Sequence, residues 1–257
     1  MNLKRFSILA AFLILGIFLT LLLSLMTFVD PARMFSLITS DRVVFSIGLS
    51  VKAALVATAI SLILAIPAGY ALSRFNFAGK TLVDTLLEVP LILTPVSMGA
   101  MLLIFFNTRA GSFLQNNLWS FVYEFSGIVL AQFLTSVGLA VRMIKNTFDE
   151  IPPRFEAVAC SLGASSGQAF LSITLPMARK GILATLGMTF AKCIGEFGAT
   201  AMLAGAMPGK SETLPVSIFI RLGSADIEGM TIMILLLLTA GISVIFVLKF
   251  ILKARYD

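Results

Sequence analysis

The chain has 257 residues, of which 58% are hydrophobic and 12% charged, and its mean hydropathy is +1.01. Soluble domains carry about 25% charged residues, so this composition excludes an ordinary soluble protein. The formal charge is +6, but the basic residues stand at the ends of apolar blocks rather than in a stripe with aromatics, which argues against nucleic-acid binding. With no histidine and no carboxylate cluster in the sequence, we expect neither a metal site nor a cofactor.

The apolar residues occur in long blocks, each near or above the roughly 20 residues that a helix needs to cross the hydrocarbon core. The predicted spans are Phe6–Val29, Val43–Leu72, Leu86–Phe106, Gly127–Ile144, Gly181–Ala206 and Met230–Leu252. The first block is longer than a signal-peptide core of about 7–15 residues and lacks an A-x-A-like cleavage site, so we expect it to remain as an anchor. The expected fold class is all-α integral membrane, with about six transmembrane helices.

The distribution of Lys and Arg orients these spans, because cytoplasmic loops carry an excess of both residues. With the N-terminus in the cytoplasm, most of the basic residues fall on the cytoplasmic side. The outer segments then hold only Arg33, Arg42, Arg109, Lys210 and Arg221. We therefore expect both termini in the cytoplasm (N-in, C-in), in a multi-pass protein of the cell membrane. In this topology Cys160 lies on the reducing side and Cys193 lies within a span, so neither is a disulfide candidate.

A long cytoplasmic loop, about residues 146–180, separates the fourth and fifth spans. Pro152 and Pro153 open it, and proline is favourable at the start of a helix because its missing N–H has no partner there anyway. Gly163 indicates a break, and Leu175-Pro176 indicates a stop. The pattern predicts two short amphipathic helices joined by a turn. These would rest on the lipid surface or dock onto a soluble partner.

The residues of this loop resemble the EAA-type loop of type I ABC importer permeases, in which EAA is followed by Gly and then by Leu-Pro. The sequence reads Glu156-Ala-Val-Ala-Cys-Ser-Leu-Gly163 and then Leu175-Pro176, with Cys160 where a basic residue is common. The resemblance implies a type I permease fold, with a short helix that docks in a groove of the ATPase subunit and transmits its closure. The coupling residues that it implies are Glu156, Ala157, Ala159, Leu162, Gly163, Ala164, Leu175 and Pro176.

A second segment is similar to the fifth helix and the following outer loop of molybdate permeases. It reads Gly195-Glu-Phe-Gly-Ala-Thr200, then Met207-Pro-Gly209 and Thr213-Leu-Pro215. Sulfate permeases share the first element but usually lack the other two. The resemblance implies import of molybdate, tungstate or a similar oxyanion, with sulfate or another small anion as the alternative. The translocation-path residues expected are Lys192, Gly195, Glu196, Phe197, Gly198 and Thr200.

Charged and small residues inside the spans suggest roles without any family. Gly195 and Gly198 fall mid-span, where small residues allow close packing or local unwinding. Glu196 is an ionisable group in the membrane and therefore a functional-site candidate. Lys192, four residues earlier on the same predicted helical face, would neutralise it, so a structural pair and a role on the anion path both stay open. Lys52 is expected to snorkel to the outer headgroups, with pore lining as the alternative.

The segment from Gly205 to Ser211 resembles a P-loop but is one residue short of G-x-x-x-x-G-K-[ST], and no predicted strand precedes it. We therefore expect a transporter subunit without its own ATPase site. The expected partners are two ABC ATPase subunits, an extracytoplasmic oxyanion-binding protein, the lipid bilayer and a second copy of the chain, because one copy offers half of a pore.

The chain is expected to divide into an N-terminal anchor helix with its outer loop, residues 1–42, and a permease core, residues 43–252, that contains the coupling loop. Two other classes of protein are disfavoured. A membrane enzyme would need clustered histidine, carboxylate or serine residues facing a cavity. A stand-alone channel would have no use for a docking loop.

Overall fold

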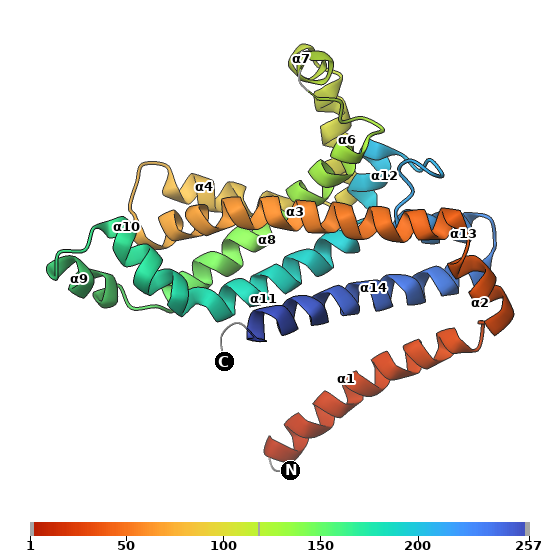
Figure 1. The fold of residues 1–257 in the computed structure, drawn as a ribbon, viewed down its shortest axis with the longest axis horizontal. Helices are drawn as coiled ribbons and strands as arrows, with labels where there is room; N and C mark the ends of the chain where they lie inside the picture. Colours follow the sequence, from red (N-terminus) through yellow and green to blue (C-terminus); the bar gives the residue numbers. More distant parts are fainter. Residues whose placement is uncertain (1–2, 118, 255–257) are drawn as a thin grey trace.

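The computed structural model describes residues 3–117 and 119–254, and the regular structure in these ranges is entirely helical (Figure 1). The helices in chain order are α1 (Leu3–Met26), α2 (Pro31–Ile38), α3 (Asp41–Arg74), α4 (Lys80–Leu86), α5 (Val89–Ile92), α6 (Pro95–Phe106), α7 (Arg109–Asn117), α8 (Phe125–Asp149), α9 (Arg154–Ser161), α10 (Ser166–Ala169), the π-helix η1 (Phe170–Thr174), α11 (Leu175–Ile194), α12 (Gly198–Ala204), α13 (Leu214–Gly223) and α14 (Ile227–Ala254). Five helices in these ranges are long and apolar enough to cross a membrane, and a bent pair makes a sixth candidate. The predicted all-α membrane architecture is confirmed.

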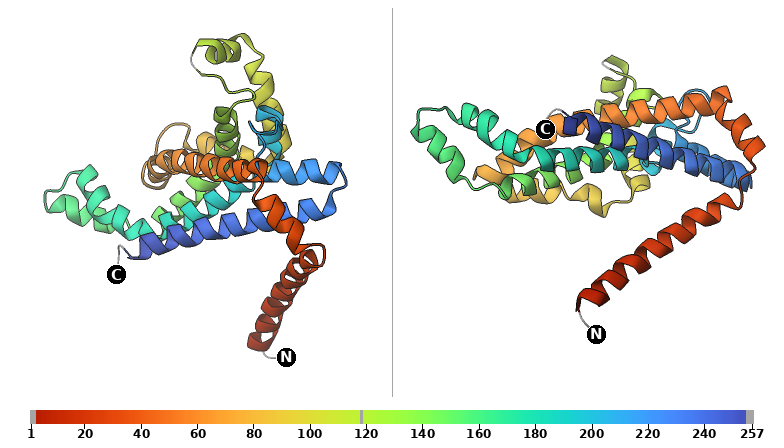
Figure 2. Two further views of the ribbon diagram at one scale, coloured as in Figure 1. Left: turned by 45° about the vertical axis from the view of Figure 1, so that its right-hand side comes forward. Right: turned by 60° about the horizontal axis from the view of Figure 1, so that its bottom comes forward.

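The centre of the bundle is the contact of α3 with α8, on which α11 packs from one side (Figures 1 and 2). The face that α3 buries is built largely from small residues, among them Ala53, Ala57, Ser61 and Ala65. Small side chains let two helix backbones approach closely in a membrane, where apolar burial alone gives no preference for another helix over lipid.

Helix α1 diverges from the bundle in both figures, and none of its apolar span is buried. The next helix, α2, is instead held at the start of α14 by ion pairs. Arg33 forms ion pairs with Asp226 and Glu228, each at 2.7 Å between nitrogen and oxygen. Burial opposes ionisation of Asp226, but the Gly229 N–H and the guanidinium groups of Arg221 and Arg33 outweigh it and lower the pKa of this carboxyl. The proposed boundary at residue 42 falls in the first turn of α3, shortly after this ion-paired helix.

The third predicted span, Leu86–Phe106, is wrong as a single straight helix. The chain forms α4 and α5 first and then turns by 112° into α6. Pro95 explains the position of the bend, because the residue before a proline avoids the helical conformation and proline itself is favourable as the first helical residue. That preceding residue, Thr94, is extended, and its hydroxyl accepts a hydrogen bond from the N–H of Ser97 at 3.2 Å, which caps α6.

The predicted boundaries of the fifth span, Gly181–Ala206, are also wrong, at both ends. Helical structure is continuous from Ser166 to Ile194 and then breaks at residues 195–197. The stop expected at Leu175-Pro176 does not occur. A proline inside an α-helix removes one hydrogen bond and clashes with the carbonyl four residues earlier, and here the wider π-helical turn η1 directly precedes α11, which takes the proline in its first turn.

Candidate coupling helix and membrane gate

The first short helix of the predicted coupling loop and the turn after it form as the sequence indicates, but the second helix, α10, is the beginning of the continuous helical segment that leads into α11. Pro153 stands at the N-cap of α9, and Gly163 turns the chain with a φ of +93°, a conformation that favours glycine. Ser165 then begins α10 with a capping box: its hydroxyl accepts from the N–H of Gln168 at 3.3 Å, and the Gln168 side chain accepts from the Ser165 N–H at 2.8 Å.

Glu156 is the residue that joins α9 to the membrane bundle. Its carboxylate accepts hydrogen bonds from Tyr70 Oη at 2.8 Å, Arg74 Nε at 2.9 Å and Thr174 Oγ1 at 2.7 Å. Arg74 also donates to the carbonyl of Ile151 at 2.7 Å. The side chains of Arg74 and Glu156 are 8% and 15% exposed, so this is a nearly buried ion pair. We call Glu156, Tyr70, Arg74 and Thr174 the Glu156 cluster.

The environment of Glu156 favours its charged form. Burial acts in the opposite direction, but the hydrogen bonds from Thr174, Tyr70 and Arg74, together with the positive charge of Arg74, lower the pKa of the carboxyl below its ordinary value. A charged Glu156 thus ties α9 to the end of α3 and to η1.

The other residues implied for coupling divide between two places. Ala157, Leu162 and Gly163 are exposed, while Ala159 and Ala164 are half-buried toward the bundle. Leu162 is 84% exposed, which leaves an apolar side chain uncovered at the tip of the loop. Leu175 and Pro176 are not on α9 but in the first turn of α11. Sequence patterns could not reveal Tyr70, Arg74 or Thr174, because their contact with Glu156 depends on the tertiary fold.

The predicted gate segment lies where α11 ends. Gly195 is the C-cap of α11, and the chain is non-helical until α12 begins at Gly198. The carboxylate of Glu196 is turned back into the protein, 4% exposed, and accepts the N–H of Ala199 at 2.9 Å. Within the described ranges no ion pair joins Lys192 to Glu196. The positive charge of Lys192 still acts on the Glu196 carboxyl, but without a direct contact, because α11 ends before Glu196.

Helix α12 packs closely on α6 at two glycines, Gly198 and Gly99. Both roles suggested for small residues in this motif therefore occur, local unwinding at Gly195 and close helix packing at Gly198. A Cβ added to Gly198 would lie 2.9 Å from the backbone nitrogen of Val96 and 3.0 Å from Cβ of Pro95. From the other side, a Cβ on Gly99 would lie 2.8 Å from Cα of Ala199. Phe197 stacks at a tilt on Phe219 of α13, with ring centroids 4.8 Å apart. The remaining predicted residue, Thr200, is fully buried.

Comparison with known proteins places this geometry in a family. The profile of the family described as "Binding-protein-dependent transport system inner membrane component" matches residues 61–257, which contain both the coupling loop and the gate segment. The chain belongs to this family of inner-membrane transport components. It is an ABC importer permease and a multi-pass protein of the inner membrane.

Curated relatives of the permease include molybdenum and sulfate transport permeases. The molybdenum transport system permease protein ModB of Haemophilus influenzae is 36% identical over 179 residues, which cover 68% of this chain and 77% of that protein. The sulfate transport system permease protein CysT of Salmonella typhimurium is 28% identical over 242 residues, 93% of this chain and 87% of that protein.

Solved structures support the fold of the permease. A chain of a bacterial ABC transporter involved in the import of the acidic polysaccharide alginate aligns with a TM-score of 0.77 at 15% identity, over 100% of this chain and 98% of that one. A chain of the MetNI methionine ABC transporter in an inward-facing conformation aligns with a TM-score of 0.64 at 17% identity, over 89% of this chain and 100% of that one.

Next to the predicted gate segment, the interior of the permease is polar where α3, α8 and α11 meet. The hydroxyls of Ser61 and Ser136 lie 3.2 Å apart, and the thiol of Cys193 donates to Ser136 at 3.3 Å. All three side chains are buried. These hydrogen bonds satisfy polar groups that would otherwise be costly in a membrane interior. Cys193 is thus a structural residue without a disulfide partner.

Proposed function

We propose that the permease is the membrane subunit of an ATP-driven importer of molybdate- or tungstate-type oxyanions. The observation that carries the coupling part of this proposal is the Glu156 cluster, which fixes an exposed apolar helix tip to two membrane helices. A partner that binds α9 and moves it would therefore also move α3 and α11, and α11 ends at the proposed gate. The likeness to ModB and the Pro208-Gly209 and Thr213-Leu-Pro215 elements favour molybdate or tungstate.

Sulfate is the second candidate substrate, and the relatives give it specific support. CysT of Salmonella typhimurium aligns over more of this chain than ModB of Haemophilus influenzae does. Molybdate, tungstate and sulfate are tetrahedral dianions, so one path through the membrane would suit all three. An external binding protein would select among them.

The partners proposed are two ABC ATPase subunits, an extracytoplasmic oxyanion-binding protein and a second copy of the permease. One solved relative of the fold, the bacterial alginate ABC transporter, was crystallised in complex with a periplasmic protein that carries an alginate pentasaccharide. A closed two-fold pair is the commonest symmetry for a subunit that needs a copy of itself. In this assembly ATP hydrolysis belongs to the partner subunits.

The function is tested by reconstitution. We expect the purified permease alone to show no ATP turnover, and to support it only with an added ABC ATPase and binding protein. Uptake of radiolabelled molybdate should then be competed by tungstate more strongly than by sulfate. Stronger competition by sulfate than by tungstate would favour sulfate as the substrate. ATP turnover by the permease alone would contradict the proposal that a partner subunit hydrolyses ATP.

The two cysteines offer a test of the proposed N-in, C-in topology, because Cys160 is exposed and Cys193 is buried. A membrane-impermeant maleimide should label Cys160 in inside-out vesicles and leave it unlabelled in intact cells. Cys193 should react only after denaturation, so a Cys160→Ser control should remain unlabelled in both preparations. Labelling of Cys160 in intact cells would show that the loop lies outside the cell and that the topology is the reverse of the one proposed.

A substitution at Gly163 tests the docking surface. A side chain at this position would meet no atom of the permease within 4 Å, and Asp tolerates a positive φ better than most residues. Gly163→Asp should therefore insert and fold like the wild type but lose most ATP-coupled uptake, because its charge would disturb the docked helix. Gly79→Asp is the matched control: it also has a positive φ of +84° and open space around it, but it lies outside the loop. Equal uptake by both variants would contradict docking at α9.

A further inference from the structure

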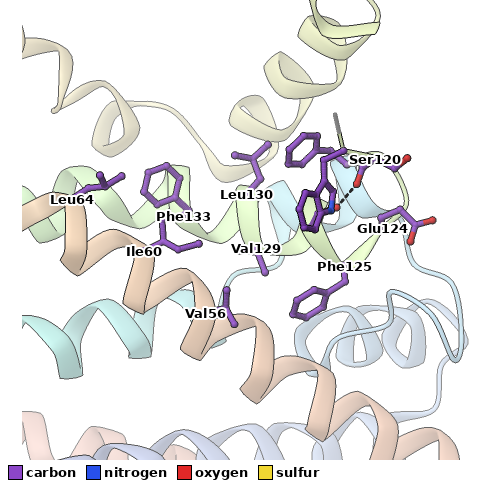
Figure 3. A pocket seen from close by; sticks show the side chains of 12 residues that line it. Val56, Ile60, Leu64, Ser120, Glu124, Phe125, Val129, Leu130 and Phe133 are labelled. Atoms are coloured by element: carbon purple, nitrogen blue, oxygen red, sulfur yellow. Dashed lines mark hydrogen bonds between the residues drawn. The ribbon is translucent and has the colours of Figure 1, made fainter. Parts of the chain in front are cut away.

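An apolar groove lies between α3, the start of α8 and residues 119–126 (Figure 3). Its volume is about 740 Å³, and small-molecule pockets occupy about 300–1,000 Å³. Its walls are formed mainly by Val56, Ile60, Leu64, Trp119, Phe125 and Phe133. None of the residues assigned to coupling or to the gate lines it, so the groove is a separate feature of the permease.

The α3 wall of the groove is open to the surroundings of the permease, since Val56, Ile60 and Leu64 are 41%, 37% and 49% exposed. The 34 residues of α3 extend about 51 Å at 1.5 Å per residue, which exceeds the roughly 30 Å of hydrocarbon core. Val56 and Ile60 lie near the middle of this helix and therefore at the depth of the acyl chains. Figure 3 shows Val56, Ile60 and Leu64 in a row along one side of α3. A groove of this shape and depth suits an acyl chain laid along α3.

A cation stands one helical turn beyond the groove. Lys52 precedes Val56 by four residues, so it lies next to Val56 and continues the row of i, i+4 positions that Val56, Ile60 and Leu64 form along α3. Its side chain is exposed and makes no hydrogen bond or ion pair with any other residue that the structure describes. Helical side chains lean toward the N-terminal end of their helix, and a lysine can extend its ammonium to the headgroups from within the apolar layer. Lys52 therefore reaches toward the headgroups at the Asp41 end of α3.

Two further observations bear on the binding of a headgroup at the groove. One concerns a tryptophan, and the other concerns the acidic residue nearby. Trp119 is 69% exposed at its edge, and tryptophan collects where acyl chains meet headgroups. The carboxylate at the same edge, Glu124, already pairs with Lys210 at 2.7 Å. Because Glu124 is paired with Lys210, it does not neutralise Lys52, and the ammonium group of Lys52 can bind an anionic ligand.

We propose that the groove binds an anionic phospholipid, with an acyl chain along Val56, Ile60 and Leu64 and the phosphate at Lys52. An unpaired lysine at the headgroup level attracts anionic lipids over zwitterionic ones, and the apolar walls exclude a water-soluble anion as the occupant. The site is independent of which anion the permease carries, and its occupancy is measured without transport.

Trp119 makes the test direct, because it is the single tryptophan of the chain. The full-length permease is placed in phosphatidylcholine nanodiscs with increasing amounts of phosphatidylglycerol or phosphatidylcholine brominated in the acyl chain, since bromine quenches tryptophan fluorescence on contact. We expect brominated phosphatidylglycerol to reach half-maximal quenching at about a fivefold lower mole fraction, the factor that one lysine near the surface contributes.

Three variants separate the parts of the site. Lys52→Gln should remove the preference for phosphatidylglycerol and leave quenching by phosphatidylcholine unchanged. Ile60→Phe, which narrows the groove, should weaken quenching by both lipids. Arg109→Gln removes an exposed cation on α7, away from the groove, and should keep the preference. Equal quenching of the wild type by the two lipids would overturn the proposal. The absence of quenching by either lipid would overturn it too, because the groove would then be covered by protein, such as a second copy.

Discussion

Glu156→Ala should lower the free energy of unfolding of the permease by roughly 3–5 kcal/mol, because it removes one partner of a buried ion pair and leaves the other charged. The side chain of Arg74 is only 8% exposed, and its guanidinium group would lose the carboxylate at 2.9 Å. Tyr70 and Thr174 would lose their acceptor as well. Chemical denaturation in detergent measures the change, and ATP-coupled uptake should fall with it because α9 is no longer held.

Three further variants make the Glu156 experiment specific. Tyr70→Phe removes one hydrogen bond to a charged group and should cost about 1.5–3 kcal/mol. The double variant Arg74→Met with Glu156→Met removes both charges and should recover part of the loss. Glu150→Ala removes an exposed carboxylate beside the same loop and should change stability by less than about 0.5 kcal/mol. A Glu156→Ala protein as stable as the Glu150→Ala control would show that the cluster does not anchor α9.

The same cluster gives the stability a defined dependence on pH. The pKa of Glu156 is lowered from its ordinary value of 4.5, so its contribution to stability is complete above that value. The contribution is lost as the pH falls through the lower pKa of the folded state, since the protonated carboxyl no longer pairs with Arg74. The difference in stability between the wild type and Glu156→Ala should therefore shrink under acid conditions.

Gly198→Ala should have the second large effect, a loss of folded yield and a fall in anion uptake of about fivefold or more. The new Cβ would stand 2.9 Å from the backbone nitrogen of Val96 and 3.0 Å from Cβ of Pro95. These are atoms of the first turn of α6, which cannot give way without moving the helix. Overpacking of this kind costs about 1–3 kcal/mol, and about 1.4 kcal/mol corresponds to a factor of ten. Thermal unfolding and uptake in proteoliposomes measure the two effects.

Gly195→Ala is the matched control in the same motif. Its new Cβ would meet only the carbonyl of Ala191 at 3.4 Å, an ordinary contact, and its φ of −86° suits alanine. We expect nearly normal yield and uptake. Equal damage by the two substitutions would mean that the motif is sensitive to any side chain, and that the contact between α6 and α12 is not what matters.

The parts of the permease whose structure is decided by residues close together in the sequence could be predicted from it. Apolar blocks locate the spans, and Pro153 and Gly163 locate the start and the turn of the docking loop. Pro95 predicts a kink or a helix end before α6, but it does not by itself determine that the chain turns by 112° there. Gly195 and Gly198 allow local unwinding, but glycine is also tolerated inside a continuous membrane helix, so the sequence left open whether the helix breaks after Ile194. The partners of Glu156 come from distant segments that only the tertiary fold brings together.

The continuity of helical structure from Ser166 to Ile194 has a mechanical consequence. Within this segment, the 20 residues of α11 form a rod about 30 Å long, with Leu175 and Pro176 in its first turn and the predicted gate segment directly after its last residue. Tilting α11 by about 5° around its first turn would carry its far end sideways by about 2.6 Å, close to the rise of two helical residues. A small rotation at the ATPase would thus be amplified into a displacement wide enough to part side chains at Gly195–Gly198, without any helix having to unfold.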